Sequence, residues 1–420
     1  MRIEIICTGD EVLTGKTVNT NFSHMSQKLE DVGLAVRWGT IVGDDRETLL
    51  EAFRLAGARA DAVIVNGGLG PTVDDLSQEI AARAAGVDLV LDAAWLARME
   101  DFFERRGRAM PPNNRKQAML PSTAERLDNP VGTACGFALD IGKARFFFTP
   151  GVPREMRRML EEQVIPRLLA RSGFQAVIRL KRFHSYGLGE SHVDALLDGI
   201  EALAPDGGVK LGFRAHYPQL ETKLAVRGAD AADIERKLAP VEAELRRRLG
   251  NFIIAEDDET LEGVVLDALR RCHGSLAVVE TFTGGQIAAR LAPLQGAEAI
   301  FRRAIVSRDL AEIAAALGLP ALEPPTPATA ERVAEAARRA AGATHALAVL
   351  IELDEGADRI EFGGTIHVAI AMPGGAVSRR ARMLGGRDWV RLGAAELALD
   401  TLRRQLKRLP IAERIDFEKT

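Results

Sequence analysis

This 420-residue chain has few cysteines, few aromatic residues and no long apolar segment, and each of these features excludes a class of function. It has only three cysteines, which match no metal-ligand spacing, so we expect buried thiols in a reducing compartment. Aromatic residues make up 5% of the chain, which argues against a stacking platform for single-stranded nucleic acid. No segment approaches the roughly 20 consecutive apolar residues that a transmembrane helix needs. We therefore expect a protein that acts on neither nucleic acids nor membranes.

Charge and composition point to an ordinary globular protein. The net charge is −4, so there is no excess of basic residues that would attract nucleic acid. Hydrophobic residues make up 47% of the chain, and its length allows two to four domains with cores of their own. The first residues read as a strand rather than as a signal peptide, so we expect a cytoplasmic location.

The segment 61–79, DAVIVNGGLGPTVDDLSQE, carries the strongest functional signal. An apolar run typical of a buried parallel strand is followed by a glycine-rich turn, two acids and a helical pattern. Backbone amides of such a turn can face an anion, and adjacent carboxylates can hold a divalent cation against a phosphate. The turn comprises Gly67, Gly68, Leu69, Gly70, Pro71 and Thr72, and the acids are Asp74 and Asp75. The alternative is a plain strand-to-helix turn with a capping aspartate.

The chain before this segment alternates between predicted strands and helices. We expect strands at 3–7, 34–42 and 62–65, and helices at 23–32, 46–57 and up to residue 85. This order predicts a parallel sheet covered on both faces, with ligands at the carboxyl ends of its strands. Each loop at those ends carries a pair of acids: Asp10 and Glu11, Asp44 and Asp45, and Asp74 and Asp75. Each pair by itself would also be typical of a helix cap or a solvated turn.

Across its whole length, the sequence predicts three domains of α/β or α+β type: 1–170, 171–255 and 256–420. The first continues through a polar insertion at 104–117 and ends with a helix that begins at Pro153; Arg154 there is either an anion ligand or a solvated charge. The second, a small α+β unit for linkage or dimerisation, has strands at 176–183, 210–216 and 222–227 and a helix at 231–249. Its segment SYGLGES looks like a helix cap. The third is α/β, with strands at 275–279, 347–353 and 365–372 and a final helix at 389–409.

Five ordered motifs resemble those of the competence/damage-inducible protein CinA family: GDEVLTGKTVNTN, VGDD, NGGLGPTVDDLS, NPVGTACGF and TPGVPREM. The resemblance covers essentially the whole chain, including SYGLGES. It implies an N-terminal domain similar to the molybdopterin-binding domain, and a homodimer. It also implies two activities: a metal-dependent pyrophosphatase acting on ADP-ribose or a related nucleotide, and a C-terminal nicotinamide-mononucleotide amidohydrolase.

The N-terminal motifs keep their carboxylates, although Asn66, Cys135 and Thr149 replace the usual Thr, Pro and Leu. We predict that Asp74, Asp75, Asp10 and Glu11 are catalytic, and that Asp10, Asp44 and Asp75 bind a divalent metal of unknown identity. The predicted substrate-binding residues are the turn residues and Asn21, Asp44, Gly132, Thr133, Gly151 and Arg154.

The C-terminal motif departs from the family pattern Glu-Ser-Cys-Thr-Gly-Gly. This chain reads Glu280-Thr281-Phe282-Thr283-Gly284-Gly285, which places Thr where the family has its Ser nucleophile. The family's downstream Tyr and Lys are also missing, because 301–320 contains neither, and Arg308 is a poor base. We therefore predict a vestigial site of Thr281, Thr283, Gly284 and Gly285 without deamidase activity. Two alternatives stay open: residual deamidase activity through Thr281, and an N-terminal domain that binds a pterin or nucleotide without turnover.

Overall fold

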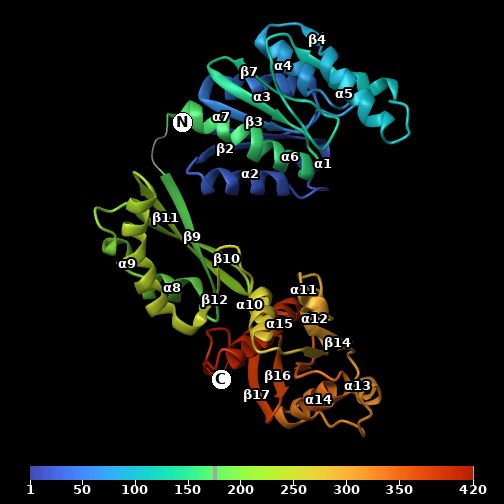
Figure 1. The fold of residues 1–420 in the computed structure, drawn as a ribbon, viewed down its shortest axis with the longest axis vertical. Coiled ribbons are helices and arrows are strands. Elements are labelled where there is room, and N and C mark those ends of the chain that lie inside the picture. Colours follow the sequence, from blue (N-terminus) through green and yellow to red (C-terminus); the bar gives the residue numbers. More distant parts are fainter. Residues whose placement is uncertain (174–176, 420) are drawn as a thin grey trace. The chain divides into compact units, whose positions relative to one another are not determined.

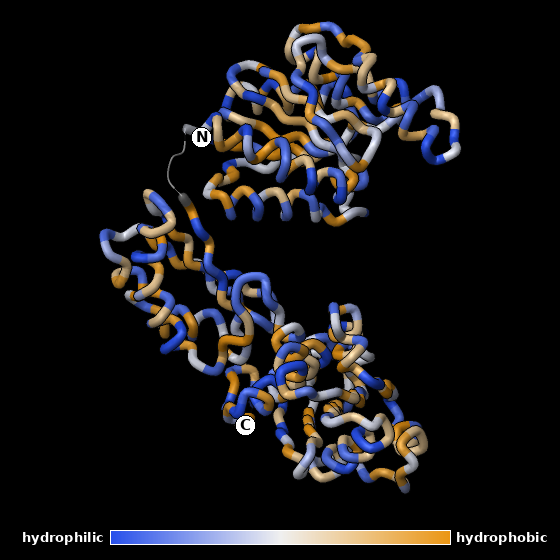
Figure 2. Tube along the Cα trace, in the orientation of Figure 1, coloured by the Kyte–Doolittle hydropathy of each residue, from blue (hydrophilic) through white to orange (hydrophobic). Residues whose placement is uncertain are grey.

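The computed structural model describes residues 1–173 and 177–419. The chain divides into two compact units, Met1–Arg179 and Leu180–Thr420 (Figure 1). Hydrophobic and hydrophilic stretches alternate over short distances along the chain (Figure 2). Among the described residues, no helix combines the length and apolar character needed to cross a membrane.

The first unit is built on a six-stranded sheet with the order β2-β1-β3-β8-β7-β6. The first four strands of that order are parallel, as predicted, and β7 and β6 add antiparallel pairings at one side. The strands are β1 (Ile3–Thr8), β2 (Val36–Val42), β3 (Ala62–Asn66), β6 (Glu125–Leu127), β7 (Gly136–Ile141) and β8 (Ala144–Thr149). The carboxyl ends of β1, β3 and β8 therefore lie side by side.

Helices cover both faces of this sheet, each over its own hydrophobic core. One core contains Phe53, Ile80 and Trp95, from α3 (Arg46–Arg59), α4 (Ser77–Ala85) and α5 (Ala93–Glu104). The other core is formed with α2 (Thr20–Asp31), α6 (Pro153–Met159), η2 (Leu160–Val164) and α7 (Ile165–Ser172). A short helix, α1 (Asp10–Leu13), follows β1 directly. Burial on both faces explains why β3 begins as a continuous apolar run and why β1 is mostly apolar, with Glu4 as a buried exception.

Some predicted boundaries differ from the structure. Helix α2 begins at Thr20 rather than at 23, because the Asn19 side chain caps it by accepting a hydrogen bond from Phe22 N at 3.0 Å. Much of the predicted polar insertion is ordered as η1 (Pro112–Ala118). The hairpin-like pair β4 (Leu89–Leu91) and β5 (Met119–Pro121), with α5 between them, was not predicted. Three-residue strands are too short for a periodicity signal.

The second unit begins with a four-stranded sheet of order β10-β11-β9-β12. Its strands are β9 (Val177–Tyr186), β10 (Val209–His216), β11 (Gln219–Gly228) and β12 (Ile253–Glu256). Helices α8 (Glu190–Leu196) and α9 (Ala231–Leu249) pack on it, with short turns η3 (Ile200–Leu203) and η4 (Gly250–Phe252). Helix α9 has the predicted bounds. Residue 176, the predicted start of the first strand here, lies outside the described residues.

A five-stranded sheet of order β14-β13-β15-β16-β17 completes the second unit. Its strands are β13 (Leu276–Glu280), β14 (Phe301–Val306), β15 (His345–Leu353), β16 (Gly363–Met372) and β17 (Gly375–Leu384). One core includes side chains of α10 (Leu261–Arg271), α11 (Gln286–Leu291), α12 (Ala297–Ile300) and α15 (Arg387–Leu406). The other includes side chains of α13 (Leu310–Leu317) and α14 (Pro327–Ala340). The sequence did not predict β17, since this edge strand carries several arginines and lacks a clear apolar pattern.

Candidate functional site

A pocket of about 510 Å³ lies at the carboxyl ends of β1, β3 and β8. This size lies within the range of small-molecule sites. Loops from well-separated parts of the first unit line it: Thr8, Gly9, Glu11, Asp44, Gly67, Gly68, Leu69, Gly70, Pro71, Thr72, Asp74, Asp75, Gln117, Thr133, Ala134, Pro150, Gly151, Val152 and Glu155. The predicted glycine-rich turn, most of the predicted acids, Thr133 and Gly151 therefore meet in one place.

The glycine-rich turn forms one wall of the pocket. Gly67 and Gly68 have φ of +110° and +69°, values that L side chains rarely adopt. The amide of Gly67 donates to Thr149 O at 3.0 Å, and that of Thr72 to Asp75 Oδ2 at 2.8 Å. The amides of Gly67 and Thr72 thus already have internal acceptors, so the predicted cradle for a pyrophosphate would depend on the amides between them.

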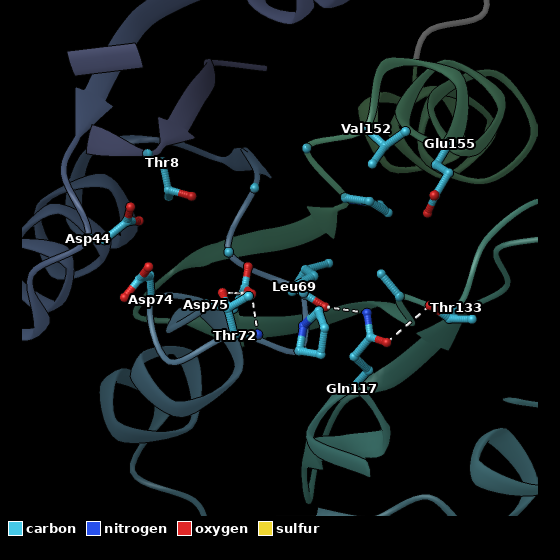
Figure 3. Close-up of a pocket in the computed structure, with 18 of the residues that line it drawn as sticks. Thr8, Asp44, Leu69, Thr72, Asp74, Asp75, Gln117, Thr133, Val152 and Glu155 are labelled. Carbon is cyan, nitrogen blue, oxygen red and sulfur yellow. Dashed lines mark hydrogen bonds between the residues drawn. The ribbon is translucent and has the colours of Figure 1, made fainter. Parts of the chain in front are cut away.

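The middle of the turn keeps its donors. Among the described residues, no group accepts a hydrogen bond from the amides of Gly68, Leu69 or Gly70. The main chain here is also held in place by two lining residues: Gln117 Nε2 donates to Leu69 O at 3.1 Å, and Thr133 Oγ1 donates to Gln117 Oε1 at 3.1 Å (Figure 3). The turn thus offers consecutive free amides on a braced backbone, which suits an anion.

Acids from three loops converge beside the turn. Asp10 and Asp44 exchange hydrogen bonds: the Asp44 amide donates to Asp10 Oδ1 at 3.1 Å, and the Asp10 amide donates to Asp44 Oδ2 at 3.2 Å. Burial raises the pKa of Asp44. The negative charges of Asp10, Glu11 and Asp74 raise that pKa further, against the lowering effect of the Asp10 amide. Four carboxyl groups are therefore close enough to repel one another.

Asp75 is engaged differently from the other acids. Its Oδ2 accepts from both the amide and the hydroxyl of Thr72, at 2.8 and 2.5 Å, so it closes the end of the turn (Figure 3). A β-carbon on Gly70 would collide with the Asp75 carboxylate. Asp75 thus organises the turn from within, and Asp74, which lines the pocket and is exposed, is the freer of the two acids.

The donor set fits a cation that is shared with a phosphate better than an all-protein metal centre. Among the described residues, no three His, Cys, Asp or Glu side chains are gathered so that they could hold a metal by themselves. A magnesium ion often needs only one or two carboxylates, with substrate phosphates and water as its other ligands. Asp44 and Asp74 meet that need, and a cation would offset the burial and the repulsion by neighbouring acids that raise the pKa of Asp44.

Asn21 lies behind the pocket and does not line it. Its Nδ2 donates to Asn66 Oδ1 at 2.9 Å and to Gly151 O at 2.7 Å, and Asn66 Nδ2 donates to Pro150 O at 2.6 Å. Both asparagines are buried. Asn21 therefore links the last residue of β3 to the loop after β8, and Asn66, which departs from the family pattern, also holds that loop through Pro150.

Three other predicted site residues also lie outside the lining: Asp10, whose carboxyl group instead accepts a hydrogen bond from the Asp44 amide, Arg154 and Gly132. Arg154 is exposed and does not line the pocket. Gly132 has an indirect role, since a β-carbon there would overlap the Glu155 carboxyl group, which does line the pocket. Sequence reasoning missed Thr8, Gln117 and Glu155. The only available signals were that Thr8 ends a predicted strand and that Glu155 lies within the motif TPGVPREM.

The C-terminal motif residues lie at the end of β13, where their polar side chains form hydrogen bonds within the domain. The Thr281 hydroxyl donates to Val349 O at 3.2 Å and accepts from Ile351 N at 3.0 Å. Glu280 is fully buried and accepts from the Thr283 hydroxyl and from the first amides of α11. Gly284 and Gly285 form the turn into α11 with positive φ. No hydrogen bond links Thr281 to a basic side chain within the part of the chain that the structure describes.

Three family models match successive parts of the chain. Residues 4–170 match the probable molybdopterin binding domain, 180–255 the damage-inducible protein CinA KH domain, and 258–406 the CinA C-terminal domain. A CinA-like protein of Geotalea uraniireducens (strain Rf4) is 37% identical over 99% of this chain and 100% of its own length. A CinA-like protein of Frankia casuarinae is 39% identical over 98% of both chains.

Among solved structures, the protein CinA with unknown function from Thermoplasma acidophilum is 35% identical, covers 41% of this chain and 98% of its own, and has a TM-score of 0.36. The curated relatives match from end to end, and the domain matches follow one another in the order of the predicted motifs. The chain therefore belongs to the family of CinA-like proteins.

Proposed function

We propose that the first unit hydrolyses the pyrophosphate bond of ADP-ribose or a related nucleotide, with the help of a divalent cation. The family resemblance implies this activity. The observation that carries the proposal is one pocket that combines the free amides of Gly68, Leu69 and Gly70 with the carboxylates of Asp44 and Asp74. Amides suit the phosphate oxygens, and carboxylates suit a cation that bridges those oxygens.

A second observation supports an anionic or hydroxyl-bearing ligand. Thr8 is 7% exposed and lines the pocket, yet its hydroxyl has no hydrogen-bond partner among the described residues. A buried hydroxyl without a partner costs free energy, so such groups in pockets tend to meet a ligand or water. Gly67 lies directly beside this hydroxyl, because a β-carbon on Gly67 would touch Thr8 Oγ1.

The geometry supports the following roles for this chain's residues. The turn amides would bind and orient the pyrophosphate, while Asn21 and Gln117 keep the surrounding loops in place. Asp44 and Asp74, with Glu11 nearby, would hold the cation, which when bound supplies charge neutralisation and a more acidic water. Asp10 positions Asp44 through their reciprocal hydrogen bonds. Asp75 maintains the shape of the turn.

The direct test is hydrolysis of ADP-ribose by the purified full chain, with magnesium or manganese and with a chelator. We expect AMP release that requires the metal. Absence of turnover with any divalent metal, together with measurable nucleotide binding, would instead support a non-catalytic pterin- or nucleotide-binding protein. Absence of both binding and turnover would contradict the proposal.

We also propose that the C-terminal domain lacks nicotinamide-mononucleotide amidohydrolase activity. The supporting observation is that the Thr281 hydroxyl is engaged with two main-chain groups and, among the described residues, is not hydrogen-bonded to a base. A hydroxyl without an adjacent base is a weak nucleophile. We expect no ammonia release from nicotinamide mononucleotide; release that is abolished by Thr281→Ala but kept in Asp74→Asn would refute this proposal.

A further inference from the structure

Glu155 contributes a carboxyl group that the proposed hydrolysis does not use. It lies in the first turn of α6 and lines the pocket. In Figure 3, Asp44 and Asp74 lie on one side of the pocket, Glu155 and Thr133 on the other, and Leu69 between them. Glu155 therefore faces the cavity from the side remote from the acids.

The carboxyl group is held in place by a buried amide. Asn129 Nδ2 donates to Glu155 Oε2 at 2.6 Å and also to Ala134 O at 3.0 Å. The Asn129 side chain is fully buried, and its Oδ1 accepts from the amides of Val131 and Gly132. Loop 129–134 is thus folded around one asparagine that fixes one oxygen of Glu155.

The other oxygen of Glu155 has no such partner. Glu155 has no cationic partner among the described residues, and the hydrogen bond from Asn129 to Oε2 is the only one its carboxyl group accepts there. The group is half-buried, and burial raises its pKa. Gly132 leaves the space that this carboxyl group fills. A carboxyl that is desolvated, fixed at one oxygen and free at the other is suited to accept a hydrogen bond from a ligand.

We infer that Glu155 is a specificity-determining residue that binds a hydrogen-bond donor on the nucleoside part of the ligand, at the end of the pocket opposite the cation-binding acids. This inference rests on the proposed function, because it takes the pyrophosphate to lie on the glycine-rich turn. Two sources of the donor share this chemistry, the ribose hydroxyls and the amino group of the base. A diphosphate without a nucleoside has neither and cannot use Glu155.

Calorimetric binding to the full chain in magnesium tests the inference with four probes: ADP, 2′,3′-dideoxy-ADP, IDP and inorganic pyrophosphate. We expect Glu155→Ala to weaken ADP binding by about tenfold or more, the usual effect of removing a charged acceptor. Pyrophosphate binding should change less than threefold. The near-isosteric Glu155→Gln variant should keep the fold and the bond to Asn129, and should lose part of the ADP affinity. Glu162→Gln, an exposed acid paired with Arg158, is the matched control.

The analogues identify the donor. If the ribose hydroxyls bind Glu155, the preference for ADP over dideoxy-ADP falls in Glu155→Ala; if the base amino group does, the preference for ADP over IDP falls. Equal weakening of ADP, dideoxy-ADP and IDP, or equal weakening of ADP and pyrophosphate, would overturn the inference. Wild-type protein that binds ADP and hydrolyses ADP-ribose would in that case leave the proposed function intact. Wild-type protein that neither binds ADP nor hydrolyses ADP-ribose would overturn both.

Discussion

At the scale of single residues, two adjacent aspartates that look equivalent in the sequence have different surroundings. Asp75 holds the end of the glycine-rich turn by accepting two hydrogen bonds from Thr72, whereas Asp74 lines the pocket without a hydrogen-bonding partner among the described residues. Asp74 is therefore free to hold a cation, and Asp75 is already engaged. This difference separates their expected mutational effects.

We predict that Asp74→Asn lowers metal-dependent hydrolysis of ADP-ribose by at least about 10- to 100-fold, because a carboxylate ligand is replaced by a neutral amide. Asp75→Asn should lower it much less, since an amide oxygen can still accept from Thr72. Initial rates across a magnesium titration measure both variants. Equal activity of Asp74→Asn and wild type would remove Asp74 from the cation site.

The pH dependence of the reaction follows from Asp44. Burial, together with the charges of Asp10, Glu11 and Asp74, raises its pKa, so this carboxyl group ionises at a higher pH than an ordinary aspartate does. Because the ionised form binds the cation, kcat/KM should rise with pH through this raised pKa.

We predict that Glu11→Gln, which removes one neighbouring charge, moves this acidic limb of the kcat/KM profile to lower pH. The profile is measured from pH 4 to 8 at one fixed metal concentration well below saturation, where protons and the cation compete for Asp44, beside the exposed-site variant Glu162→Gln. An acidic limb that stays in place in Glu11→Gln would show that Asp44 does not control it.

At the scale of elements, helix α15 carries several charged side chains that are buried: Glu396, Asp400, Arg403 and Arg404. Asp400 is fully buried and pairs with Arg403 and Arg404 at 2.7 Å each, and both arginines are at most 2% exposed. A buried ion pair need not stabilise a fold relative to apolar packing, but removal of one partner leaves an uncompensated charge. The network therefore makes α15 sensitive to substitution at its acid.

We predict that Asp400→Ala destabilises the second unit by about 3 to 5 kcal/mol. Its melting temperature in scanning calorimetry should fall by roughly 6 to 20 °C. Asp388→Ala, which breaks the exposed pair with Arg391 on the same helix, should change stability by only about 0.5 kcal/mol. Similar losses of stability in the two variants would show that the buried ion pairs of Asp400 contribute no more than an exposed pair does.

At the scale of the whole molecule, the proposed site belongs entirely to the Met1–Arg179 unit. Its lining comes from loops of a single six-stranded sheet. A ligand that binds there stabilises the unit that contains the site, by about 2.7 kcal/mol at a concentration 100 times the Kd.

We therefore predict that ADP with magnesium raises the melting temperature of one calorimetric transition and leaves a second transition, that of the Leu180–Thr420 unit, in place. The Asp400→Ala variant identifies the second transition, because it lowers that transition selectively. An equal shift of both transitions by ADP would show that the second unit also binds the nucleotide or is thermodynamically coupled to the first.

Local sequence determined much of this protein. The apolar runs of β1 and β3, the glycine-rich turn, and the periodic helix α9 could be read directly, because strand burial, positive φ and helical periodicity are properties of neighbouring residues. The carboxyl ends of parallel strands necessarily meet at one edge, so the sequence also predicted that Asp44 and Asp74 would share a site with the turn.

Tertiary structure alone decided which polar groups are free. The sequence cannot show that Asp75 and the outer turn amides have internal partners, that Asn21 links β3 to the loop after β8, or that Glu155 faces the cavity with Asn129 fixing one of its oxygens. These outcomes depend on hydrogen bonds between residues far apart in the chain, such as the pair Asn21 and Gly151. A hydrogen bond forms or fails within a few tenths of an ångström, a precision that residue types and spacing do not specify.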